Sequence, residues 1–159
     1  MSEDECLPLD PDVTDADLTP PAARPGLDVL AVIAVGGALG SLARWGLSQL
    51  FPHDGSGFPW ATFDANVSGC LLLGVLMALI ADVLPPSRYL RPFLGVGVLG
   101  GYTTFSTYLL DVRNLLASGA AGTAAGYLVG SLLAGTAAVW VGISAVRAFL
   151  LVRRWRVAG

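Results

Sequence analysis

Four long apolar stretches, separated by short connections rich in glycine and proline, set the pattern of this 159-residue sequence. About 20 apolar residues cross the hydrocarbon core of a membrane as an α-helix. The stretches are unbroken, whereas the strands of a membrane β-barrel alternate apolar and polar positions. We therefore predict an all-α membrane protein with four transmembrane helices. They are Val29–Leu50, Trp60–Val83, Phe93–Leu110 and Tyr127–Val146, the last with room to extend over Thr123–Leu151.

Composition supports the membrane class and excludes several others. Hydrophobic residues make up 54% of the chain and charged residues only 13%, about half the charged share of a soluble domain. A soluble enzyme and a nucleic-acid-binding domain are therefore excluded. The one histidine, His53, lies in a connection, and no nucleophile–base pair is visible, so we do not expect an enzyme.

Charge divides the chain unevenly. Residues 1–28 carry eight acidic residues, one arginine and five prolines, and are too polar to bury a core. We predict a disordered acidic tail over 1–28, a transmembrane domain over 29–151 and a basic C-terminal tail over 152–159. Four spans put both tails and the second connection on one side. That side holds seven arginines, against Arg113 and Arg44 toward the other. The positive-inside rule then predicts a multi-pass protein of the inner (plasma) membrane with both termini in the cytoplasm.

Polar residues inside the apolar stretches are candidate functional residues. Asn66 in the second stretch either bonds to a neighbouring helix or lines a water-filled path. Arg44 either extends to the membrane surface or faces an aqueous vestibule. Tyr127 and Ser131, four residues apart, place two hydroxyls on one helix face. Gly36, Gly37 and Gly40 predict a close helix contact.

The third stretch holds the least helical sequence. Gly95–Gly100 fits a dinucleotide-binding pattern, but no strand is predicted before it, so that interpretation fails. Two glycines and a run of hydroxyl and aromatic residues then follow over Gly100–Tyr108, and these are poor helix formers. Either the helix is broken at mid-membrane and frees carbonyls that can hold a cation, or it is kinked and its threonines bond back to the preceding turn.

Phe105 and Tyr108 share one face of this third helix, with Ser106 and Thr107 beside them. They form either a packing stripe or a set of positively polarised ring edges that face an anion.

Three motifs together resemble the Fluc (CrcB) family of fluoride channels. They are Gly36-Gly37-x-x-Gly40-x-x-x-Arg44, Asn66-x-x-Gly69 and Thr103-Thr104-Phe105-Ser106-Thr107-Tyr108, and the likeness covers about residues 29–150. The resemblance implies a fluoride-selective channel, built as an antiparallel dimer with two pores. Such a channel exports fluoride passively and lowers its cytoplasmic concentration.

The resemblance also implies roles for individual residues. The carbonyls of Gly100 and Thr103 correspond to those that hold a central sodium ion at the dimer interface. Fluoride is tightly hydrated, so hydroxyls, an amide and ring edges suit a path that replaces its water. The residues implied to line this path are Asn66, Phe105, Ser106, Thr107, Tyr108, Tyr127 and Ser131, with Arg44 in the vestibule.

This sequence departs from the family pattern at three positions. Asp64 precedes Asn66 by two residues, Tyr108 stands in place of a second phenylalanine, and Asp111 in place of a glutamate. The arginine bias predicts one dominant orientation, and hence pairing with a homologous subunit of opposite orientation. Two alternatives stay open: a partner subunit without activity of its own, and a small multidrug exporter. The exporter would need a membrane carboxylate, typically a glutamate in the first stretch, which here carries Arg44.

Overall fold

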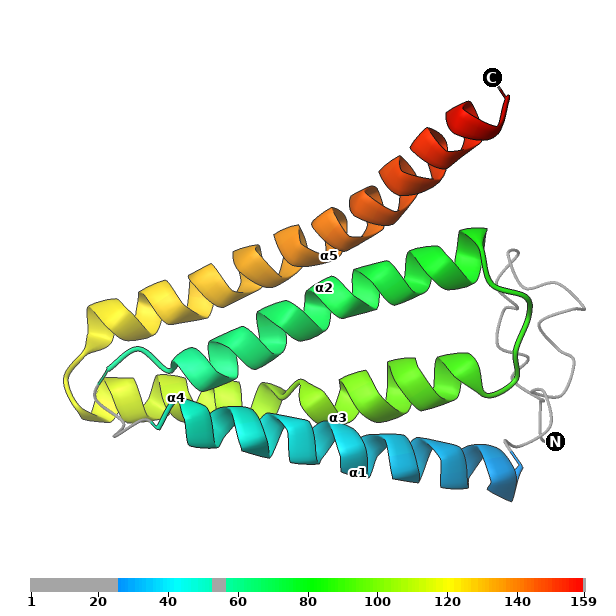
Figure 1. The fold of residues 1–159 in the computed structure, drawn as a ribbon. Coiled ribbons are helices and arrows are strands. Elements are labelled where there is room, and N and C mark those ends of the chain that lie inside the picture. The colour runs from blue at the N-terminus through cyan, green and yellow to red at the C-terminus, as the bar shows by residue number, and fades with distance from the viewer. Residues whose placement is uncertain (1–25, 53–56, 159) are drawn as a thin grey trace, which may run out of the picture.

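The computed structural model describes residues 26–52 and 57–158, with side chains up to Arg153. Within these residues every regular element is helical, and four helical stretches are long and apolar enough to cross a membrane. Both findings confirm the sequence prediction. In chain order the elements are α1 (Leu27–Leu50), α2 (Trp60–Asp82), the π-helix η1 (Arg91–Leu99), α3 (Gly100–Tyr102), α4 (Phe105–Ala117) and α5 (Ala121–Ala158) (Figure 1).

Helix boundaries differ from the prediction by more than one residue in three of the four stretches. The α1 helix begins at Leu27, so Asp28 belongs to its first turn and not to the tail; residues 1–25 of that tail lie outside the described residues. The third stretch runs over Arg91–Ala117. The α5 helix continues to Ala158, through most of the expected basic tail. Hydropathy marks where a helix leaves the membrane, and arginine is a good helix former that lets the helix continue beyond that point.

The helices run between two ends of the molecule. Figure 1 shows the start of α1, the α2–η1 connection and the end of α5 at one end, and the end of α1, the start of α2 and the α4–α5 connection at the other. The α5 helix lies alongside α2, and α1 lies against η1 and α3. Arg88, Arg91 and Arg147 are thus near the same end of the bundle, whereas Arg113 lies in the last turns of α4, toward the opposite end.

Glycines bring α1 and η1 into backbone contact. A Cβ atom added to Gly36 would lie 2.6 Å from the carbonyl oxygen of Phe93 and 3.0 Å from Cα of Gly97. One added to Gly97 would lie 2.9 Å from Cα of Gly36. The predicted close contact is therefore confirmed. Within the Gly95–Gly100 pattern, Gly97 serves packing, and in the part of the chain that the structure describes no strand precedes the pattern.

A methyl group at Gly40 is expected to disrupt this contact. The added Cβ would overlap the carbonyl oxygen of Val98 and lie 2.8 Å from the backbone nitrogen of Tyr102, so backbone must move. Gly40→Ala should destabilise the protein by about 2–3 kcal/mol, seen as a lower unfolding temperature in detergent. Gly46→Ala, on the same helix with nothing within 4 Å of the added atom, is the control. It should be neutral or stabilising, and equal effects would contradict the contact.

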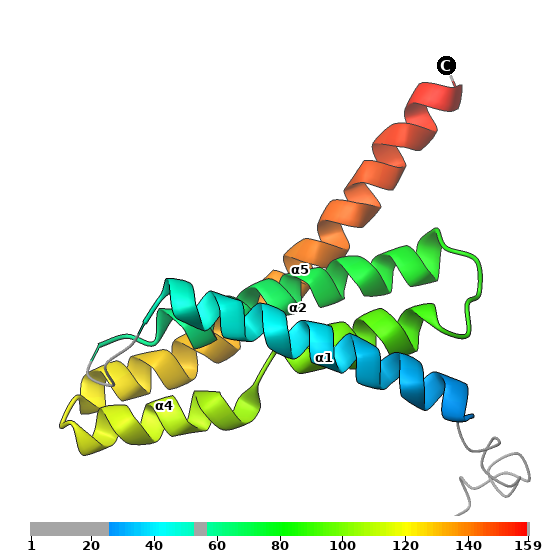
Figure 2. The same ribbon diagram turned by 60° about the horizontal axis from the view of Figure 1, so that its bottom comes forward.

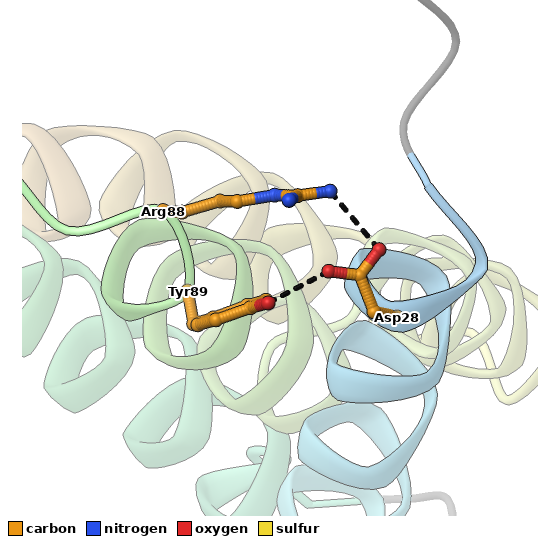
Figure 3. Close-up of polar contacts among 3 residues, drawn as sticks. All are labelled: Asp28, Arg88 and Tyr89. Atoms are coloured by element: carbon orange, nitrogen blue, oxygen red, sulfur yellow. Dashed lines mark hydrogen bonds and ion pairs between the residues drawn. The ribbon is translucent and has the colours of Figure 1, made fainter.

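Two exposed ion pairs join helices at the end of the molecule where α1 begins and α5 ends. Arg88 Nη2 lies 3.0 Å from Asp28 Oδ1, and Tyr89 Oη donates to Asp28 Oδ2 at 2.7 Å (Figure 3). The hydrogen bond to this carboxylate, together with its charge, raises the pKa of Tyr89 above its usual value. Arg147 Nε lies 3.2 Å from Asp82 Oδ2. The first pair holds the start of α1 to the α2–η1 connection, and the second holds α5 to the end of α2.

Candidate functional site

Two extended residues interrupt the third helical stretch. Thr103 (φ −81°, ψ 156°) and Thr104 (φ −149°, ψ 128°) connect α3 to α4 (Figure 2). In a continuous helix the N–H groups of Thr104 and Thr107 would donate to the carbonyls of Gly100 and Thr103. Here Thr104 N donates to Asn66 Oδ1 at 2.8 Å, and Thr107 N donates to Thr104 Oγ1 at 3.2 Å. Both carbonyls thereby lose their helical donors.

Thr103 also bonds back to the preceding turn. Its N–H and its hydroxyl both donate to the carbonyl oxygen of Leu99, each at 2.9 Å. The back-bonding expected for a kinked helix is thus present at Thr103, whereas Thr104 turns to α2 for its partners.

Asn66 holds the interruption from α2. Its Nδ2 donates to the carbonyl of Thr104 at 3.0 Å, while its Oδ1 accepts the N–H of the same residue. The side-chain amide thus replaces both helical partners of Thr104. Of the two alternatives for Asn66, the bond to a neighbouring helix is the one observed, and it needs only one of the two Nδ2 hydrogens.

Thr104 is a central residue of this site that the sequence analysis did not single out. Its Oγ1 accepts the N–H of Thr107, donates to Thr107 Oγ1 at 3.1 Å and lies 3.3 Å from Ser106 Oγ. This is the N-cap of α4. One sequence signal for this cap was available: Thr104 lies three residues before Thr107, at the start of a helical segment, where threonine is a common N-cap residue. The cap links the hydroxyls of Ser106 and Thr107 into one group.

Arg44 reaches the interruption from α1. Its Nε donates to the carbonyl of Gly101 at 3.2 Å, and Ser41 Oγ donates to the same oxygen at 3.4 Å. The arginine therefore satisfies a carbonyl close to the interruption. Ser41 is a second residue that no local sequence pattern singles out, because its partner lies 60 positions away.

A pocket of about 350 Å³ lies beside the interruption. It brings together Asn66, Gly100, Thr103 and Phe105 of the predicted site residues, and Phe105 is 69% exposed. The α2, η1, α3 and α4 helices all contribute to its wall. The other lining residues are Gly69, Cys70, Leu73, Gly95, Leu99 and Thr104.

Tyr108 and Tyr127 lie outside this pocket, buried between α4 and α5. Tyr108 Oη donates to the carbonyl of Leu128 at 2.6 Å, and Tyr127 Oη donates to Asp111 Oδ2 at 3.4 Å. Ring centroids are 5.9 Å apart from Phe105 to Tyr108 and 5.1 Å from Tyr108 to Tyr127. The three rings thus form a continuous row leading away from the pocket.

Ser131 follows one turn after Tyr127 on α5. Its Oγ is buried and has no hydrogen-bond partner among the described residues. A buried hydroxyl without a partner costs free energy, and such groups in native proteins call for a functional or solvent explanation.

A cation at this site would depend on backbone oxygens. Within residues 26–52 and 57–158 no group of three or more histidine, cysteine or acidic side chains could hold a metal ion. The carbonyls of Gly100 and Thr103, which have lost their helical donors, are oxygen ligands of the kind that unwound membrane helices offer to sodium.

Comparison with known proteins gives consistent matches. The family model described as "CrcB-like protein, Camphor Resistance (CrcB)" matches residues 31–143. A Nocardia farcinica protein named fluoride-specific ion channel FluC 2 is 49% identical over 132 residues, 82% of this chain and 94% of the relative. Two Streptomyces avermitilis proteins, fluoride-specific ion channels FluC 2 and FluC 3, are 50% and 46% identical over 104 and 130 residues. These cover 65% and 82% of this chain and 66% and 63% of the relatives.

Proposed function

Because this chain belongs to the CrcB family, we propose that it forms a fluoride-specific ion channel. The matched region, residues 31–143, contains the interruption and most of each membrane-crossing stretch. The protein is a multi-pass membrane protein, and fluoride leaves the cell through it passively, which lowers the cytoplasmic concentration. The observation that carries this function is the family match over a region in which Asn66 and Phe105 line one pocket.

The fluoride path follows the pocket and the row of rings. Fluoride gives up its water only where other donors replace it. Asn66 has a second Nδ2 hydrogen, Ser106 and Thr107 have rotatable hydroxyls, and Ser131 has a buried hydroxyl without a partner. Ring edges of Phe105 and Tyr108 add weak attraction without a fixed charge that would hold the ion. Because the Tyr108 hydroxyl donates to Leu128, its ring edge is the part that serves fluoride.

A second subunit covers the pocket in this proposal. Phe105 is 69% exposed in the single chain, although a pore residue must be shielded from lipid. In this proposal an antiparallel second subunit packs over the pocket, so that the interruptions of the two chains meet near the middle of the membrane. The carbonyls of Gly100 and Thr103 from each subunit then hold a sodium ion, which supplies the positive charge that their lost donors no longer provide.

Sodium removal tests this part of the proposal. Replacing sodium by N-methyl-D-glucamine should lower the unfolding temperature of the assembled protein in detergent, because the carbonyls would lose their shared cation. Potassium at equal ionic strength is the control for a general salt effect. An unfolding temperature that is the same in all three solutions would contradict the sodium site.

The predicted orientation of the chain in the membrane points to a heterodimer with a homologous subunit. The arginine bias puts both termini in the cytoplasm, so the opposite subunit is best supplied by a homologue of opposite bias. Streptomyces avermitilis has at least two relatives of this chain, as such pairing requires. Asp64, an acidic residue two positions before Asn66, would repel fluoride and favours one second candidate function, a partner subunit that conducts no fluoride through its own pore.

Fluoride efflux from vesicles tests the function. The purified chain is reconstituted alone and with a co-expressed homologue, and a fluoride-selective electrode records the released ion. We expect rapid fluoride efflux and no chloride efflux from the pair, and slow efflux from the chain alone. Rapid efflux from the chain alone would refute the need for a homologous partner subunit but not the channel function. Absence of flux in every combination would refute the channel.

A further inference from the structure

The last turns of α5 extend beyond the rest of the helix bundle. The α2 helix ends at Asp82, whose carboxylate pairs with Arg147 of α5. The α5 helix continues past this pair over Ala148–Ala158, a length of roughly 16 Å at about 1.5 Å per residue. Figures 1 and 2 both show this end pointing away from α1, α2 and η1. The segment Ala148–Ala158, here called the α5 extension, therefore has no helical neighbour among residues 26–52 and 57–147.

Apolar and basic residues follow one another along the α5 extension. Phe149, Leu151 and Val152 are 67%, 57% and 54% exposed, and Arg153 is exposed as well. The sequence then continues with Arg154, Trp155 and Arg156. Large apolar residues next to arginine and tryptophan are typical of helix segments at the membrane–water boundary.

We propose that the α5 extension binds the phosphate groups of anionic lipids. In this arrangement Phe149, Leu151 and Val152 contact the acyl chains, and Arg153, together with the two arginines that follow it in the sequence, supplies positive charge for the headgroups. Asp111 is the last acidic residue of the sequence, so the α5 extension carries no acidic residue that could neutralise these arginines. Clusters of arginines that follow a membrane span attract anionic headgroups.

The acidic N-terminal segment is a less suitable occupant. Asp28, in the first turn of α1 just after that segment, is engaged with Arg88 and Tyr89 at the α2–η1 connection and not with α5. An acidic peptide would also leave the apolar residues of the α5 extension exposed, whereas a lipid leaflet covers both kinds of residue.

Lipid retention by the full-length protein tests this proposal. Wild type and the triple variant R153Q/R154Q/R156Q are purified from mixed micelles of phosphatidylglycerol and phosphatidylcholine, and the bound lipids are counted by mass spectrometry. Each arginine near an anionic surface adds about a fivefold preference. The triple variant should therefore lose about a hundredfold in preference for phosphatidylglycerol. Arg113→Gln, at the opposite end of the bundle, should keep the wild-type preference.

Two results would overturn the proposal. One is an unchanged lipid preference in the triple variant. The other is a preference that rises when residues 2–25 are deleted from the wild type but not from the triple variant, because the acidic segment would then be the ligand of the arginines. Fluoride efflux of the triple variant with its partner should match wild type. That measurement separates failure of the lipid contact from failure of the channel.

Discussion

Replacing Asn66 by aspartate is expected to stop fluoride efflux while the subunits still assemble. The carboxylate keeps the oxygen that accepts the N–H of Thr104 but loses the donor to the carbonyl of the same residue. It also places a negative charge at the pocket, where repulsion of fluoride should lower the rate by about a hundredfold or more. The initial rate of efflux from vesicles, read with a fluoride-selective electrode, measures the effect.

Asn114→Asp provides the matched control for that substitution. It makes the same chemical change on α4, toward the end of the helix away from the interruption. We expect near-normal efflux from this variant, and size-exclusion profiles like those of wild type for both. Normal efflux from Asn66→Asp would show that Asn66 does not line the proposed fluoride path. Its role would then be only to join α2 to the interruption.

A second large effect is expected from Phe105→Leu, which should lower the rate of fluoride efflux by about ten- to a hundredfold. Leucine keeps an apolar side chain at the pocket but has no ring edge to face the anion, and each tenfold loss corresponds to about 1.4 kcal/mol. The row of rings from Phe105 through Tyr108 to Tyr127 would lose its first member. Efflux from vesicles that contain equal amounts of assembled protein measures the loss.

Phe149→Leu is the control for Phe105, because the two phenylalanines are almost equally exposed in the single chain, at 67% and 69%. Phe149 lies on the α5 extension, far from the pocket in sequence and in the fold. Its substitution should leave efflux unchanged. Equal rates from the two variants would mean that Phe105 contributes hydrophobic area and no specific interaction with fluoride.

Local properties of the sequence were sufficient to predict the spans. Hydropathy needs no knowledge of neighbours, so all four stretches and the all-α class were predicted correctly. The glycines of the first stretch likewise predicted a close contact, because small residues are what such contacts need. The π-helical geometry of η1 was not predicted, since nothing in the local sequence pattern distinguishes a π-helix from an α-helix.

Contacts between distant residues were beyond prediction from the sequence. Asn66 and Thr104 are 38 positions apart, and Arg44 and Gly101 are 57 apart. The sequence indicated that Asn66 needs a partner, but only the fold identifies the backbone of Thr104 as that partner. The same holds for Tyr108, whose hydroxyl donates to the carbonyl of Leu128, 20 positions away.

The backbone contact between α1 and η1 has a mechanical consequence. Where side chains separate two helices, rotamer changes let one helix slide along the other, but Gly36 and Gly97 leave no such layer between these backbones. We therefore expect the two helices to move together. Because η1 contributes Gly95 and Leu99 to the pocket, the proposed pore would have no sliding gate on that side, which suits a conduit that stays open without an energy source.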